Sequence, residues 1–294
     1  MDQPAPQAPA ELNGTRPYRL TRPAAGATPT PVIFASPHSG RIYPSAMMAA
    51  SLLDPTAIRR SEDAHVDALV AAAPEYGHTL IAAEFARAYL DVNREPWELD
   101  PGMFEDELPP FAQARTARVA AGLGAIARIV CEGQEIYARK LTFAEAEARV
   151  QAVHQPYHEA LSALIGEAKD RCGVALLIDC HSMPSAAAAA AAGPCDIVLG
   201  DRFGAACAGA ITRLVERQLE EAGYRVARNA PYAGGYTTEH YGRPSRRVHA
   251  LQIEISRGLY FDETTLKLAE GFARLKEDLG RLFEALAQAD WRAL

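Results

Sequence analysis

Short apolar runs alternate with helical patterns along this chain, and the alternation constrains its fold more than any other feature of the sequence. Strand-like runs cover residues 32–36, 78–83, 87–92, 174–180, 196–199, 224–228 and 248–255. Helical patterns cover residues 54–60, 61–73, 144–169, 204–222 and 262–287. Strands that alternate with helices in this way pack into a mainly parallel sheet with helices on both faces. The sequence therefore predicts an α/β fold.

The length of 294 residues suits one large α/β domain. No internal repeat or linker interrupts the chain after residue 31, so we expect one domain over residues 15–294. It follows a flexible tail, rich in Pro and Ala, over residues 1–14. Seven consecutive alanines at residues 186–192 fit either a loop or a helical turn, and we assign them no chemistry.

Two histidines stand directly after apolar strand-like runs. His38 follows the run 32–36, and His181 follows the run 174–180. Open α/β sheets place their ligands at the carboxyl ends of the strands. A catalytic zinc takes three ligands from His and Asp or Glu and leaves a fourth position open. We therefore expect both imidazoles to bind a metal, the structural alternative being two polar side chains that end strands and bind nothing.

The third ligand should be a carboxylate, and the segment Ser61-Glu62-Asp63-Ala64-His65-Val66-Asp67 offers three. Asp63 is the first candidate and Glu62 the second. Asp67 is four residues beyond Asp63, so the two share one face of the predicted helix. The alternative is that these acidic residues only complement the helix dipole.

A buried carboxylate is expected in the last strand-like run. Leu251, Ile253 and Ile255 alternate there with polar residues, so Glu254 lies on the opposite face of the strand. A carboxylate in an apolar strand is costly unless it is paired or used, and we assign Glu254 as the general base. The alternative is an edge strand with Glu254 in water.

Two further segments could bind an anionic substrate. Arg94 follows the run 87–92, and its guanidinium could hold a carboxylate with two hydrogen bonds, with Asn93 as an added donor. The alternative for Arg94 is a salt bridge to the acidic loop that follows. The Gly-rich loop 230–243 contains Gly235, Thr237 and His240, which could close over a ligand, although a polar surface loop is the simpler interpretation.

Bulk properties and missing motifs exclude several functions. The net charge of −7 argues against nucleic-acid binding, and no apolar run is long enough to cross a membrane. The N-terminus does not resemble a secretory signal. The five cysteines are odd in number and show no CxxC spacing, which is typical of reduced thiols in a cytoplasmic protein. Dinucleotide, P-loop, GxSxG and HExxH motifs are absent from the sequence.

Taken together, the polar segments resemble the N-formylglutamate amidohydrolase family from about residue 32 to residue 261. The resemblance rests on seven segments in matching order: Pro37-His38-Ser39-Gly40, Glu62-Asp63-Ala64-His65-Val66-Asp67, Asp91-Val92-Asn93-Arg94-Glu95-Pro96, Tyr157-His158-Glu159-Ala160-Leu161, Asp179-Cys180-His181-Ser182, Gly234-Gly235-Tyr236-Thr237-Thr238-Glu239-His240-Tyr241-Gly242 and Gln252-Ile253-Glu254. That family is similar in turn to the zinc carboxypeptidase and aspartoacylase group.

The resemblance implies a phosphorylase/hydrolase-like, zinc carboxypeptidase-like fold with a central mixed sheet, and one Zn²⁺ per chain or another divalent ion in its place. His38 and His181 match ligands, Glu254 matches the catalytic glutamate, and Asn93-Arg94 matches the pair that binds the substrate carboxylate. The larger group takes its carboxylate ligand three residues after the first His, where this chain has Arg41. The match points to Asp63 and leaves Glu62 and Asp67 open.

The resemblance also implies the reaction. We expect zinc-dependent hydrolysis of the amide of N-formyl-L-glutamate to L-glutamate and formate, at the end of histidine degradation in the cytoplasm. One alternative is a metal-dependent deacylase of other N-acyl amino acids or small peptides. A second is a non-catalytic binding protein of the same fold.

Overall fold

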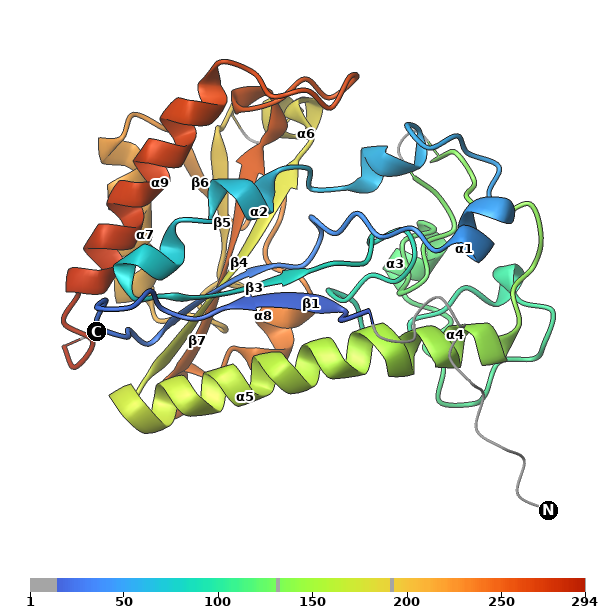
Figure 1. Ribbon diagram of the computed structural model, residues 1–294, viewed down its shortest axis with the longest axis horizontal. Helices are drawn as coiled ribbons and strands as arrows, with labels where there is room; N and C mark the ends of the chain where they lie inside the picture. The colour runs from blue at the N-terminus through green and yellow to red at the C-terminus, as the bar shows by residue number, and fades with distance from the viewer. Residues whose placement is uncertain (1–14, 131–132, 191–192, 294) are drawn as a thin grey trace. The chain divides into compact units, whose positions relative to one another are not determined.

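The computed structural model describes residues 15–130, 133–190 and 193–293 (Figure 1). The predicted tail therefore lies outside the described residues. Contacts between Cα atoms divide the chain into two compact units. Unit 1 comprises Met1–Arg19, of which the last five residues are described, His38–Glu62 and Ala83–Ala160. Unit 2 comprises Leu20–Pro37, Asp63–Ala82 and Leu161–Leu294.

The strands form one seven-stranded sheet in the order β1-β3-β2-β4-β7-β5-β6. Their bounds are β1 (Tyr18–Thr21), β2 (Val32–Ser36), β3 (Thr79–Ala83), β4 (Ala175–Met183), β5 (Ile197–Gly200), β6 (Val226–Arg228) and β7 (Val248–Ser256). Strand β2 pairs in parallel with β3 and β4, and β4 pairs in parallel with β7. Strand β5 is antiparallel to β7 and parallel to β6. The expected α/β fold with a mixed, mainly parallel sheet is confirmed.

The α-helices of the described residues are α1 (Ser45–Ala49), α2 (Val66–Leu69), α3 (Ala117–Ala120), α4 (Phe143–Arg149), α5 (Gln155–Cys172), α6 (Ser185–Ala190), α7 (Gly209–Glu221), α8 (Tyr236–Tyr241) and α9 (Gly271–Gln288). A π-helical segment, η6 (Val150–His154), joins α4 to α5. Short 3-10 helices are η2 (Ile58–Ser61), η3 (Ala73–Tyr76), η4 (Pro101–Met103), η7 (Pro244–Arg246) and η8 (Arg257–Leu259).

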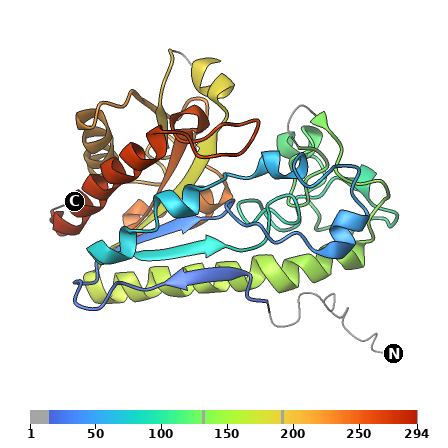
Figure 2. The same ribbon diagram turned by 45° about the horizontal axis from the view of Figure 1, so that its top comes forward.

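The main hydrophobic core of unit 2 lies on one face of the sheet. Alternate residues of the central strands, such as Phe34, Ile178 and Ile253, belong to one buried cluster with side chains of α2, α7 and α9. Helix α5 lies on the other side of the sheet from α7 and α9 (Figures 1 and 2). The helices therefore cover both faces, as the alternation of strands and helices predicts.

The prediction of a strand over residues 87–92 is wrong. The segment is largely buried, but it consists of turns and irregular backbone. Side chains satisfy its carbonyl groups in place of a neighbouring strand: Arg149 donates to the carbonyl of Tyr89, and His158 donates to that of Val92. Its apolar residues are needed for burial and not for sheet formation.

Several predicted helices are shorter than expected. Only η2 and α2 form within residues 54–73, because Glu62 is extended and His65 has a left-handed φ of 64°. Helix α9 begins at Gly271 and not near residue 262, because Asp262 accepts hydrogen bonds from two backbone amides in a turn and Leu266 has a φ of 57°. The predicted loop 230–243 contains α8, a helix that the sequence analysis missed.

The predicted helix over residues 144–169 is confirmed, although η6 interrupts its α-helical geometry. Helix α6 covers the first part of the alanine run, and residues 191–192 lie outside the described residues. Cys172, Cys180, Cys195 and Cys207 are free thiols, and Cys131 is not among the described residues. Over the described part of the chain, none of the helices is both long and apolar enough to cross a membrane.

Candidate functional site

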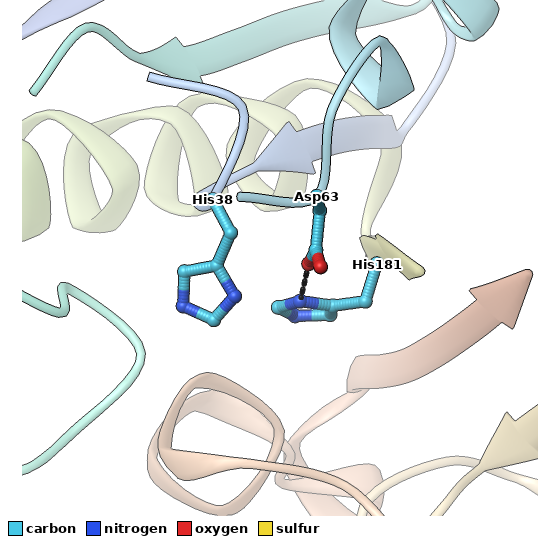
Figure 3. A group of neighbouring side chains, drawn as sticks. All are labelled: His38, Asp63 and His181. Carbon is cyan, nitrogen blue, oxygen red and sulfur yellow. Dashed lines mark hydrogen bonds and ion pairs between the residues drawn. The ribbon is translucent and has the colours of Figure 1, made fainter. Parts of the chain in front are cut away.

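His38, Asp63 and His181 form one buried group of possible metal ligands (Figure 3). One ligand atom of each residue lies within 4.8 Å of the others, and the three side chains are at most 4% exposed. His38 follows β2 by two residues, and Asp63 precedes α2. His181 lies inside β4, because that strand continues to Met183 beyond its predicted end.

The other two candidates for the third ligand are differently placed. Both carboxylate oxygens of Glu62 are bonded to Arg59, at 2.9 and 3.1 Å, and one also accepts from the hydroxyl of Tyr43. Asp67 is partly exposed in the first turn of α2. Of the three carboxylates, Asp63 is therefore the one that the structure brings to the two histidines.

Each histidine of the group has a second buried carboxylate on its Nε2 atom. The Nε2 atom of His38 lies 2.6 Å from Oδ1 of Asp91, and that of His181 lies 3.0 Å from Oδ2 of Asp179. Metal-binding histidines usually bond such a partner through the nitrogen that does not face the metal. The donor set thus fits a metal in its outer contacts as well as in its ligands.

The sequence alone predicts no role for Asp91 or Asp179. Asp179 stands two residues before His181 on β4, so the alternation of a strand was a signal that both share one face. Asp91 is 53 residues from His38, and no local pattern indicates that contact.

Buried charge at the group favours a cation. Burial alone would lower the pKa of His181, but the carboxylates of Asp179, Asp63 and Glu254 hold that pKa well above its usual value. Burial would likewise raise the pKa of Asp91, yet the side chains of His38, Arg87 and Arg94 keep it well below its usual value. These carboxylates favour positive charge at the buried group, and a divalent cation would supply it.

The orientation of Asp63 is fixed by two further residues that the sequence analysis missed. Its Oδ1 atom accepts hydrogen bonds from the Ser182 hydroxyl at 3.1 Å and from Arg257 at 3.2 Å. Its Oδ2 atom lies 3.0 Å from Nδ1 of His181. Both oxygens of the Asp63 carboxylate are therefore held by other residues of unit 2.

Glu254 lies beside the metal-ligand candidates of unit 2. Strand β7 pairs with β4 on one side and β5 on the other, so the edge-strand alternative is wrong. Glu254 is the register partner of His181 and is only 7% exposed. Oε1 of Glu254 accepts a hydrogen bond of 2.8 Å from Gln252. A buried carboxylate at this position is suited to proton transfer.

The predicted substrate-binding residues of unit 1 lie next to Asp91. The backbone amide of Asn93 donates to Asp91 at 2.8 Å, and Nε of Arg94 lies 4.0 Å from the same carboxylate. Arg94 also donates to the carbonyls of Leu123 and Asn93. Within the described residues, no carboxylate of the following acidic loop pairs with Arg94 at 4.0 Å or less.

The loop residues of unit 2 have differing environments. The amide of Gly235 donates to Oε1 of Gln252 at 2.7 Å, which links the start of α8 to Glu254 through one side chain. Thr237 is buried, whereas His240 is exposed and stacks on Tyr236 at 5.0 Å between ring centroids.

A mainly parallel α/β sheet that carries a buried His–Asp–His group with a glutamate beside it defines a candidate metallohydrolase. Comparison with known proteins gives the family. The family model of N-formylglutamate amidohydrolase matches residues 30–261. This chain belongs to the N-formylglutamate amidohydrolase family, which is a family of hydrolases that act on an amide.

Individual relatives agree with this assignment. N-formylglutamate deformylase of Pseudomonas aeruginosa is 30% identical over 239 residues, 79% of this chain and 83% of the relative. The deformylase of Pseudomonas putida is 28% identical over 238 residues, 80% of this chain and 83% of the relative. The crystal structure of N-formylglutamate amidohydrolase from Ralstonia eutropha JMP134 is 39% identical, with a TM-score of 0.89 over 95% of this chain and 100% of that one.

Proposed function

We propose that residues 15–294 act as one amidohydrolase domain that hydrolyses N-formyl-L-glutamate to L-glutamate and formate with the help of Zn²⁺. The observation that carries the proposal is the buried His38–Asp63–His181 group with Glu254 next to His181. The names of the relatives support the substrate. The reaction would complete a histidine-degradation route in the cytoplasm, as the family resemblance implies.

In this proposal the three ligands and Glu254 have separate tasks. A zinc ion held by His38, Asp63 and His181 would lower the pKa of a water and polarise the formyl carbonyl. Glu254 accepts a proton from the attacking water and passes it to the amino nitrogen of glutamate as the C–N bond breaks. Gln252 donates a hydrogen bond to one oxygen of Glu254 and so helps to orient the carboxylate for this proton transfer.

The proposed substrate contacts depend on the positive charge of Arg94, a side chain that hydrogen bonds already hold in place. The guanidinium of Arg94 binds a carboxylate of the substrate, with the side chain of Asn93 as a further donor. Arg94 is already anchored through two backbone carbonyls, so little side-chain entropy remains to be lost on binding. Gly235, Thr237 and His240 orient the rest of the substrate.

Substitution of Arg94 tests the substrate assignment. We expect Arg94→Ala to raise the KM for N-formyl-L-glutamate by roughly a hundredfold, the cost of a charged hydrogen-bond pair, and to change kcat much less. The matched control is Arg217→Ala on α7, where an exposed arginine pairs with Glu221. A wild-type KM in Arg94→Ala, or faster turnover of N-acetyl than of N-formyl-L-glutamate, would contradict the proposal.

A further inference from the structure

Three side chains from one helical stretch hold the backbone of the segment that carries Asn93 and Arg94. An Nη atom of Arg149 donates to the carbonyl of Tyr89 at 3.1 Å. Nε2 of His158 donates to the carbonyl of Val92 at 2.7 Å, and Nε2 of His154 donates to that of Arg94 at 2.9 Å. The carbonyls on either side of Asn93 are therefore both held by imidazoles.

The π-helical segment η6 explains how these donors come to point the same way. Arg149 and His154 are five residues apart, and in an α-helix of 3.6 residues per turn their side chains would diverge by about 140°. A π-helix has i→i+5 hydrogen bonds, so five residues make little more than one turn. Segment η6 spans Val150–His154 and so brings His154 back to the face of Arg149.

The two imidazoles also restrain each other. The ring centroids of His154 and His158 are 4.2 Å apart with an interplanar angle of 30°. His154 is only 4% exposed. A carbonyl oxygen can only accept, so each Nε2 atom must carry a proton and the ring orientation is determined. The pair is a rigid double donor, with His154 from η6 and His158 from α5.

We propose that His154 and His158 are positioning residues for substrate binding: they hold the Val92–Arg94 backbone so that the guanidinium of Arg94 meets the substrate carboxylate. This inference rests on the proposed role of Arg94. It gives a function to the Tyr157-His158-Glu159 segment, one of the motifs behind the family resemblance, for which the catalytic scheme has no use.

The test replaces one histidine by two amide side chains of different length, glutamine and asparagine. In His158→Gln the amide nitrogen can occupy the place of Nε2, whereas in His158→Asn it is too short to reach the carbonyl of Val92. We expect His158→Asn to raise the KM for N-formyl-L-glutamate about tenfold with kcat within about twofold, and His158→Gln to recover most of the loss. The same pair at His154 should behave alike. Glu159→Gln, on the exposed face of α5, is the control.

A second measurement does not depend on the substrate. Hydrogen exchange at the backbone amides of residues 91–95 should be faster in His158→Asn than in His158→Gln or Glu159→Gln. Faster exchange in His158→Asn together with a wild-type KM in Arg94→Ala would support the role of the histidines in holding the segment but refute Arg94 as the partner of the substrate. The two proposals can therefore fail separately. Equal KM values and equal exchange in the Asn and Gln variants would overturn the positioning role.

Discussion

At the scale of single residues, the histidines of the candidate metal centre are controlled by carboxylates behind them. Asp91 bonds His38 and Asp179 bonds His181, each through the Nε2 atom. Such a partner fixes the orientation of the ring and makes the other nitrogen a better donor. Asp91 is itself held by Arg87, so its position does not depend on His38 alone.

Removing the charge behind one ligand should weaken metal binding. We expect Asp179→Asn to lower the affinity for Zn²⁺ by about 10- to 100-fold, the usual cost of losing a carboxylate partner. The affinity is measured by competition with a chromophoric chelator. Asp170→Asn, an exposed residue of α5, is the control and should bind as the wild type does. Equal affinities of the two variants would show that Asp179 does not support His181.

The proposed catalytic role of Glu254 predicts a variant that keeps its metal but has a much lower kcat. Glu254→Gln retains the shape of the side chain but cannot accept a proton, so kcat should fall by about 10²- to 10⁴-fold. Metal content, measured by atomic emission, should stay at the wild-type ratio. A near-normal kcat would remove Glu254 from the mechanism, and loss of the metal would make it a structural residue instead.

At the scale of elements, the start of α8 depends on the end of β5. A Cβ atom at Gly200 would lie 2.7 Å from the carbonyl carbon of Ala233 and 2.8 Å from the nitrogen of Gly234. These are backbone atoms, so the segment that leads to Gly235 would have to move. Gly200→Ala should therefore lower the free energy of unfolding by about 1–3 kcal/mol. It should also raise KM, because Gly235 bonds Gln252.

A matched glycine provides the control. Gly166 lies within α5, and a Cβ atom there would meet nothing within 4 Å. Gly166→Ala should leave KM unchanged and raise stability by up to about 1 kcal/mol, since alanine favours the helix. Chemical denaturation of both variants measures the difference. If they unfold alike, the contact between β5 and the segment before α8 is not a constraint.

Elements with regular patterns are the part of the fold that the sequence predicts well. The expected runs of β2, β4 and β7 are apolar or alternating, and each forms a strand, although β4 extends three residues beyond its expected end. The segment 87–92 is largely buried but forms no strand. The carbonyls of Tyr89 and Val92 bond side chains that are 60 and 66 residues away, which no local pattern indicates. Helix α8 is short and follows two glycines, so its sequence favours a loop.

In the candidate site, too, local patterns predict some residues, whereas contacts between distant parts of the chain determine others. His38, Asp63 and His181 are predicted as a group from strand ends and residue chemistry, and they lie together. Their supporting contacts join distant parts of the chain: Arg257 is 194 residues from Asp63, and Asp91 is 53 residues from His38. In the sequence alone, such partners are polar residues with no indication of what they contact.

At the scale of the whole molecule, one core histidine should make stability depend on pH. His78 is fully buried, with Nε2 donating to the carbonyl of Phe283 and Nδ1 at 2.7 Å from the Thr30 hydroxyl. Burial lowers the pKa of His78 to about 4, although the bond to Phe283 opposes the shift. The imidazole of His78 therefore binds a proton more tightly in the unfolded chain than in the folded protein. The stability that neutral His78 contributes is fully present above pH 6.5 and is lost as the pH falls toward 4.

The shift corresponds to about 3 kcal/mol of unfolding free energy between these limits. Urea unfolding of the wild type and of His78→Gln at pH 7 and pH 4.5 measures it. The variant keeps a donor for the carbonyl of Phe283 but does not titrate. Between pH 7 and pH 4.5 its unfolding free energy should therefore fall less than that of the wild type, and the difference should be most of this amount. Parallel losses in the two proteins would mean that His78 does not control the acid sensitivity.

The central claim is that His38, Asp63 and His181 hold a divalent ion that the hydrolysis needs. Formate release from N-formyl-L-glutamate by protein stripped with a chelator, with and without added Zn²⁺, tests it most directly. We predict negligible release by the stripped protein and full recovery at about one Zn²⁺ per chain, with no recovery in His181→Ala. Undiminished release by protein that is free of metal would contradict the account.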